Sequence, residues 1–137
     1  MNRRLAIMAG ISLLMAWVNP LYADNNTSVA DSATSQQTAI QKMAVIMHRL
    51  KHFPSPQSKQ TLEQIISDPA STGREKDLAG AMLRLNHRAL VDDKIKLKKI
   101  MENENASSDE RDLASIIYNL DHRPTKGDKK RLKEMMQ

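Results

Sequence analysis

The chain has 137 residues, no cysteine, and 21 Lys and Arg residues against 16 Asp and Glu. Without cysteine it can form neither disulfides nor a thioether-linked lipid anchor, and its length leaves room for about one domain. Aromatic residues make up only 3% of the chain, which excludes a surface built from many base- or sugar-stacking rings.

The first 23 residues have the order of a cleavable secretory signal peptide. Arg3 and Arg4 form a basic start, residues 5–18 are uncharged and mostly apolar, and an Asn-Pro break precedes the small residue Ala23. This order is the signal-peptide pattern, and the apolar run is shorter than the roughly 20 residues of a membrane span. The alternative is an uncleaved anchor or a buried helix. We expect cleavage after Ala23, a periplasmic mature protein, and no integral membrane span after cleavage.

The segment after the predicted cleavage site differs from both of its neighbours. Residues 24–37 are rich in Asn, Ser, Thr, Asp and Gln and have almost no apolar side chain, which predicts a disordered leader. The helical domain is then expected at residues 38–137. Cleavage would also remove Arg3 and Arg4, leaving 19 Lys and Arg against 16 Asp and Glu. So small an excess gives little reason to expect a nucleic-acid partner.

From residue 38 onward, an internal repeat of 35 residues organises the chain. The motif Leu-x-His occurs three times at this spacing and ends at His52, His87 and His122. Upstream of the motif, residues 75–79 (EKDLA) match residues 110–114 (ERDLA). Apolar residues within each unit recur at helical spacing. A period of this length, made of helix pairs, is typical of stacked repeat proteins.

Capping signals place the helices within each repeat. Thr72 with Glu75, and Ser107 with Glu110, match the capping box at the same phase of the repeat. Three further residues are candidate N-caps of shorter helices: Ser58, Asp93 and Asp128. We expect six helices, long alternating with short, at about residues 38–52, 58–67, 72–87, 93–103, 107–122 and 128–136.

The apolar residues of the longer helices form a stripe that repeats. The stripe consists of Leu78, Ala81, Met82 and Leu85 in one copy and of Leu113, Ile116, Ile117 and Leu120 in the next. One helix pair cannot bury such a face alone, but neighbouring pairs can bury it jointly. The predicted fold class is therefore all-α: three 35-residue helix-pair repeats forming a short right-handed α-solenoid or a compact six-helix bundle.

The period and the helix pairing resemble the tetratricopeptide class of helix-pair repeats. The resemblance covers residues 38–137 and is one of period and layout. It implies a protein-binding scaffold and not an enzyme.

The three histidines and the methionines also allow a metal-carrier interpretation. We expect His52, His87 and His122 to lie at the ends of the longer helices, where histidine interacts favourably with free carbonyls and with the helix dipole. Packed helices are about 8–10 Å apart, so equivalent positions should be about 10 Å or more apart, too far for one metal. The methionines occupy repeat columns filled elsewhere by Leu or Ile and are expected in the core. No metal site and no cofactor are predicted.

The remaining sequence features favour binding over catalysis. The chain has no Gly-rich phosphate loop, nucleophile elbow or His-Glu-x-x-His motif, and no catalytic residue is predicted. A basic stretch near the end is a possible partner-binding surface through Lys126, Lys129, Lys130 and Lys133. The favoured function is a periplasmic adaptor or assembly chaperone that binds another envelope protein, such as a pilus or secretion component. The alternatives are an envelope stress or inhibitor protein that binds a secreted enzyme, and a Met/His metal carrier.

Overall fold

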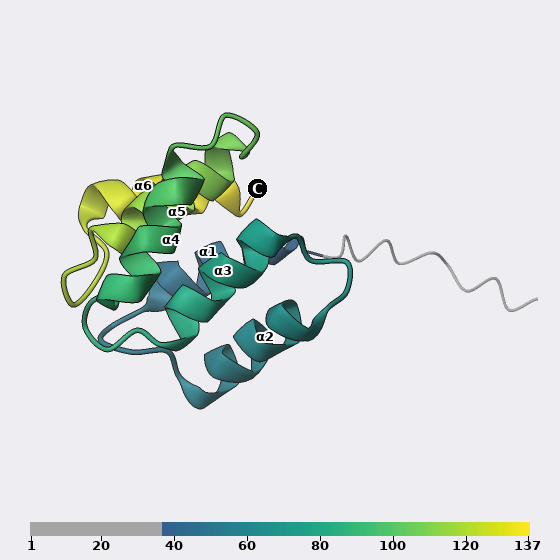
Figure 1. Cartoon of the computed structure of the whole chain (residues 1–137). Helices are drawn as coiled ribbons and strands as arrows, with labels where there is room; N and C mark the ends of the chain where they lie inside the picture. The colour runs from purple at the N-terminus through teal and green to yellow at the C-terminus, as the bar shows by residue number, and fades with distance from the viewer. Residues whose placement is uncertain (1–36) are drawn as a thin grey trace, which may run out of the picture. The chain divides into compact units, whose positions relative to one another are not determined.

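A computed structural model describes residues 37–137. The predicted signal peptide (1–23) and all but the last residue of the predicted leader (24–37) lie outside the described residues. The described part contains six helices and no strand, which confirms the all-α fold (Figure 1). The helices are α1 (Ala39–Arg49), α2 (Pro56–Ser67), α3 (Gly73–Leu83), α4 (Val91–Met101), α5 (Ser108–Tyr118) and α6 (Lys126–Met135).

Capping boxes begin α3 and α5, as predicted. The Thr72 hydroxyl accepts a hydrogen bond from the Glu75 amide at 3.2 Å, and the Thr72 amide donates to the Glu75 carboxylate at 2.7 Å. Ser107 and Glu110 form the same pair of bonds at 3.1 and 2.7 Å. Each box satisfies two backbone groups that a helix start otherwise leaves without a partner.

The predicted N-caps of the second helix in each helix pair are wrong by three residues. The N-caps of α2, α4 and α6 are Ser55, Leu90 and Thr125, so that Ser58, Asp93 and Asp128 lie inside the first turn. An earlier hydroxyl performs the capping in α2 and α6, where Ser55 and Thr125 accept from the amides of Ser58 and Asp128. Pro56, the first residue of α2, also fits this position because it lacks an amide proton.

The predicted ends of the longer helices are also wrong. Helices α1, α3 and α5 stop at Arg49, Leu83 and Tyr118, three or four residues before the positions expected from the repeat. The histidines therefore lie in loops, and two of them, His87 and His122, have positive φ angles of 65° and 64°. A left-handed residue cannot continue a right-handed helix. As a result the six helices have nearly equal lengths, and there is no alternation of long with short.

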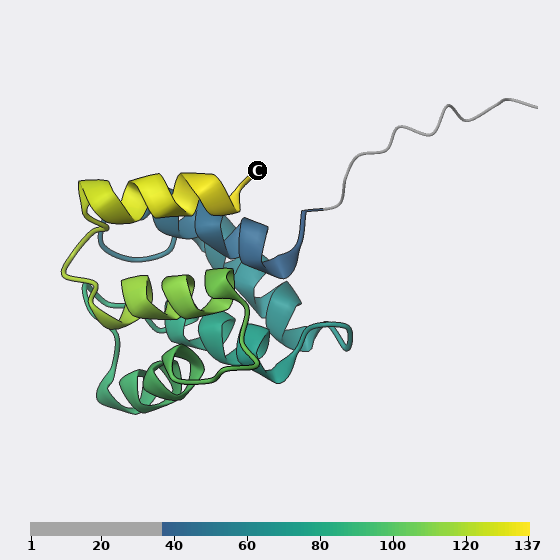
Figure 2. The ribbon, with the colours of Figure 1, turned by 90° about the horizontal axis from the view of Figure 1, so that it is seen from above.

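The three helix pairs close into a ring. Helices α1, α3 and α5 contact one another, while α2 packs mainly against α3, α4 against α5, and α6 against α1. The last pair thus packs against the first, and Figure 2 shows α6 lying along α1. Of the two predicted arrangements, this closure is that of a compact six-helix bundle with an approximate threefold axis.

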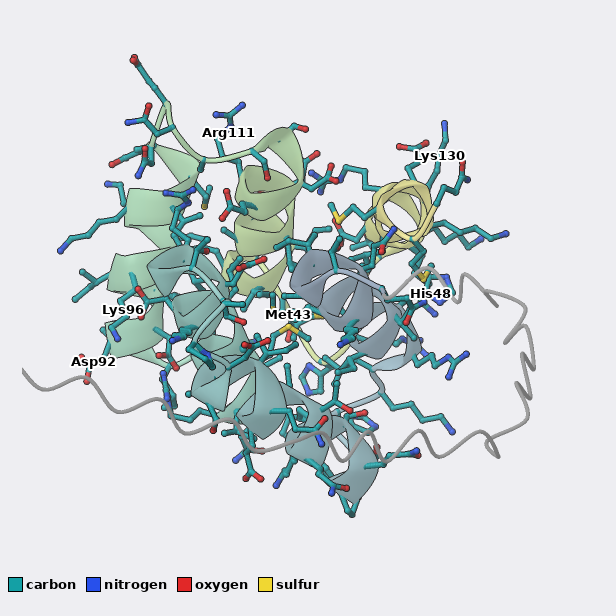
Figure 3. All side chains as sticks on the ribbon, turned by 90° about the vertical axis from the view of Figure 1, so that its right-hand side faces the viewer. Met43, His48, Asp92, Lys96, Arg111 and Lys130 are labelled. Carbon is teal, nitrogen blue, oxygen red and sulfur yellow. The ribbon has the colours of Figure 1, made fainter. Side chains whose placement is uncertain are left out.

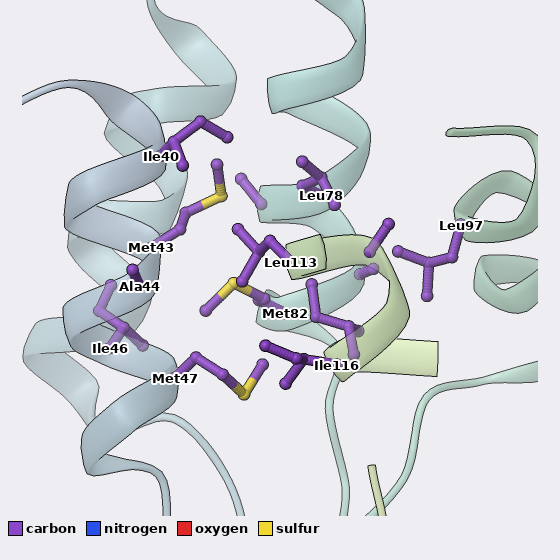
Figure 4. Packing of buried hydrophobic residues seen from close by; sticks show 14 of the residues in the cluster. Ile40, Met43, Ala44, Ile46, Met47, Leu78, Met82, Leu97, Leu113 and Ile116 are labelled. Atoms are coloured by element: carbon purple, nitrogen blue, oxygen red, sulfur yellow. The ribbon is translucent and has the colours of Figure 1, made fainter. Parts of the chain in front are cut away.

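The core repeats the same buried columns three times. In Figure 4, Met43, Met82 and Leu113 extend from three different helices into one cluster. Each repeat also contributes a small residue, an alanine, at the same position of this core. The fully buried side chains of the three columns are Met43, Ala44, Met47, Leu78, Ala79, Met82, Leu113, Ala114 and Ile117. The predicted role of these methionines as core residues is confirmed.

The second helices complete this core from outside. Leu62 on α2, Leu97 on α4 and Leu132 on α6 stand at equivalent positions, and each is fully buried. Between residues 37 and 137, no helix combines the length and the apolar character needed to cross a membrane.

Candidate functional site

The three repeat histidines meet at one end of the helical ring. His52, His87 and His122 follow α1, α3 and α5, and their ring centroids are 5.1 Å (His52–His87), 4.8 Å (His87–His122) and 6.1 Å (His52–His122) apart. The expected separation of 10 Å or more is therefore wrong. Histidines on the ends of stacked helices would be that far apart, whereas these histidines lie in loops that closure of the ring brings together.

Backbone hydrogen bonds join the three loops in series. The His87 amide donates to the His52 carbonyl at 3.1 Å, and the His122 amide donates to the His87 carbonyl at 2.8 Å. The left-handed conformation of His87 and His122 is uncommon for residues other than glycine. These bonds fix the loops relative to one another, so the three rings are held close together by the backbone and not only by side-chain packing.

The imidazole nitrogens have different surroundings. His122 Nδ1 lies 2.6 Å from the Asp121 carboxylate, which also binds the Arg88 guanidinium at 3.1 Å. The bonds from Arg88 and His122 hold the pKa of Asp121 below its ordinary value. The Nδ1 atom of His87 is buried and has no hydrogen-bond partner within residues 37–137. A buried polar atom without a partner is costly, which makes it the least satisfied atom of this cluster.

A basic crevice of about 760 Å³ adjoins the histidines. Its walls come from the end of α1, from the loops after α1 and α5, and from α6. None of the lining residues is acidic, and only Leu50 is apolar. The residues that line the crevice are His48, Arg49, Leu50, Lys51, His52, His122, Arg123 and Lys129.

The cations of the crevice differ in their ion pairing from most other arginines of the domain. Arg74, Arg84 and Arg131 each bind a carboxylate of another helix. By contrast, no ion pair between described residues involves the four cations of the crevice, which are Arg49, Lys51, Arg123 and Lys129. Their charge is therefore available to an anionic group.

The four lysines predicted as a partner-binding surface do not form one site. All lie on α6, but only Lys129 lines the crevice, and it is half-buried. Lys126, Lys130 and Lys133 are exposed elsewhere on α6, and Figure 3 shows Lys130 on the outer side of that helix.

Sequence reasoning missed Arg49, Lys51 and Arg123, because the first two belong to the first repeat and Arg123 to the third, and only closure of the ring brings them together. The available signal was their position within or directly beside the repeated Leu-x-His motif.

Comparison of the chain with protein-family models, with curated proteins and with solved structures gives no match.

Proposed function

We propose that this chain is an exported, non-catalytic binding protein that docks an acidic segment of another envelope or secreted protein in the basic crevice. It would serve as an adaptor or assembly chaperone for that protein. The observation that supports this role is the set of four crevice cations without an ion pair among the described residues.

The charge and exposure of the crevice residues suit an acidic segment of a partner. A lining of one charge sign raises the local concentration of oppositely charged ligands and steers their approach. Three of the four cations, Arg49, Lys51 and Arg123, are exposed at their positions, so that a partner could reach them without a rearrangement of the core. Binding through such charges is expected to be screened by salt, over about 10 Å at 0.1 M ionic strength.

Charge reversal in the crevice should weaken binding strongly while leaving the fold intact. The crevice variant carries Arg49→Glu, Lys51→Glu and Arg123→Glu. The matched control reverses the same number of charges on the outer part of α6, with Lys126→Glu, Lys130→Glu and Lys133→Glu. With a fluorescent oligo-glutamate peptide as the probe, anisotropy should show at least a tenfold loss of affinity for the crevice variant. The control should bind within about threefold of the unchanged protein, because Lys126, Lys130 and Lys133 do not line the crevice. Both variants carry the same change in net charge, so a difference between them reports on the crevice itself.

Two results would contradict this assignment. Equal losses in both variants would mean that the peptide responds only to net charge. A loss confined to the α6 control would place the docking surface on Lys126, Lys130 and Lys133. Circular dichroism of both variants checks that the helices are retained, and affinity measured at rising salt should fall for the unchanged protein.

Export itself is tested by the mass of the mature protein. We expect cleavage after Ala23, so that the mature chain begins at Asp24. Mass spectrometry of periplasmic and cytoplasmic fractions measures this directly. A chain that retains Met1 and stays in the cytoplasm would rule out an envelope partner.

A further inference from the structure

The spacing of the three histidine rings matches the spacing that a shared metal ion imposes. A metal–nitrogen bond is about 2.0–2.1 Å long, and the centre of an imidazole ring lies roughly 1 Å behind the nitrogen. Each ring centre is therefore about 3 Å from the ion. With tetrahedral angles at the ion, two ring centres are about 5 Å apart. The observed separations are 4.8, 5.1 and 6.1 Å. We propose that His52, His87 and His122 form a binding site for a divalent transition metal of the Zn²⁺ class. This site goes beyond the proposed docking function.

The rings of His52 and His87 need to rotate before they can bind the ion, whereas His122 keeps its contact with Asp121. As they stand, no three His, Cys, Asp or Glu side chains of residues 37–137 are placed so that they could hold a metal ion, and the histidine rings are tilted by 59–84° to one another. The Cβ–Cγ torsion of histidine is broad. Rotation about it swings the nitrogens while the ring centre hardly moves, because the bond points through the ring. The backbone-linked loops can therefore stay in place while the nitrogens turn toward a common centre.

Two of the three rings show features typical of metal ligands. The buried Nδ1 atom of His87 has no partner among the described residues, and a metal bond would satisfy it. His122 uses Nδ1 to contact the Asp121 carboxylate at 2.6 Å, which leaves Nε2 free for a metal. Histidine ligands usually place their second nitrogen on such a carboxylate, because this contact orients the ring and increases its basicity. Asp121 is thus a positioning residue, held in turn by Arg88.

The basic crevice sets the character of the remaining metal position. Three imidazoles leave the fourth position of a tetrahedral Zn²⁺ ion open to water or another ligand. His52 and His122 also line the crevice with Arg49, Lys51 and Arg123, so a metal held there would face cations. These cations lower the affinity for a bare dication and favour an anion as its fourth ligand.

Metal titration of the full chain, prepared without a histidine tag, tests the site. Zn²⁺ is followed by calorimetry and Co²⁺ by its visible absorption, which is intense when the ion is four-coordinate. We expect one equivalent to bind. His52→Asn, His87→Asn and His122→Asn should each weaken binding at least a hundredfold; asparagine is chosen because it tolerates the positive φ at two of these positions. His48→Asn is the matched control, because His48 lines the same crevice but lies outside the cluster. The affinity of this variant for the metal should equal that of the unchanged protein.

Further readouts separate a ligand role from a structural one. Asp121→Asn should weaken binding by about 10- to 100-fold, the usual effect of losing the carboxylate behind a histidine ligand. NMR tests the site in the unsubstituted chain. One equivalent of Zn²⁺ should shift the imidazole signals of His52, His87 and His122 and leave those of His48 unchanged.

Three results would overturn the site: no saturable binding, equal loss in the His48→Asn control, or imidazole shifts confined to His48. Oligo-glutamate binding by metal-free protein tests the docking function separately, so failure of one proposal is distinguishable from failure of the other.

Discussion

Replacement of Leu120 by alanine is expected to lower the free energy of unfolding by about 2–5 kcal/mol. Leu120 follows α5 and is only 5% exposed, and the equivalent residues Leu50 and Leu85 are equally buried, at 5% and 4%. The substitution leaves a cavity at the point where the loop turns toward the histidine cluster. A loss of this size is a large fraction of the stability of a small domain, typically 5–15 kcal/mol. Leu85→Ala should behave in the same way, since it occupies the same column.

Denaturant unfolding measures this loss, and Ile95→Ala is the matched control. Ile95 lies inside α4 but is 56% exposed, so its truncation should change the stability by no more than about 0.5 kcal/mol. If Leu120→Ala and Ile95→Ala unfold at the same denaturant concentration, Leu120 does not occupy the buried column of the repeat.

Replacement of Arg84 by methionine is expected to destabilise the domain by about 2 kcal/mol. The guanidinium binds both oxygens of Asp93, whose side chain is only 3% exposed. Methionine keeps the apolar stem but leaves this carboxylate buried without its cation. Loss of one partner from a fully buried ion pair costs about 3–5 kcal/mol. The expected value is lower because the Arg84 side chain is 47% exposed, so that water screens the pair.

A double variant and an exposed pair isolate this effect. Arg84→Met combined with Asp93→Asn removes both charges and should recover part of the lost stability, with a coupling energy on the order of 1 kcal/mol or more. Lys96→Met is the matched control, because the Lys96–Asp77 pair is exposed on both sides at 53% and 42%, and it should cost less than about 1 kcal/mol. Additive losses in the double variant would show that Asp93 does not depend on Arg84.

The sequence predicted the class and number of the helices because their signals are local. Capping boxes mark the starts of α3 and α5, and apolar spacing marks the buried columns of Leu78 and Leu113. These features depend on neighbours within one or two turns, so that one sequence suffices to recognise them. The ends of α1, α3 and α5 were misplaced because Leu85 and Leu120 continue the apolar spacing of the preceding helix, although the chain has already left it.

The candidate site could not be predicted in the same way because it depends on closure of the ring. Contact of α6 with α1 joins segments from opposite ends of the domain, and no single repeat encodes that contact. Without closure, His52 and His122 would stand at opposite ends of a row of repeats. The basic crevice has the same origin, since Arg49 and Lys51 come from the first repeat and Arg123 and Lys129 from the third.

The most direct test of this account is a nuclear Overhauser measurement between the imidazole rings of the metal-free protein. The closed ring predicts contacts for all three pairs, including His52 with His122, whose ring centroids are 6.1 Å apart. An open row of repeats would give contacts for His52–His87 and His87–His122 only. Cross-peaks for all three pairs would support the ring, the histidine cluster and the crevice together. Absence of the His52–His122 cross-peak while the other two are present would contradict them.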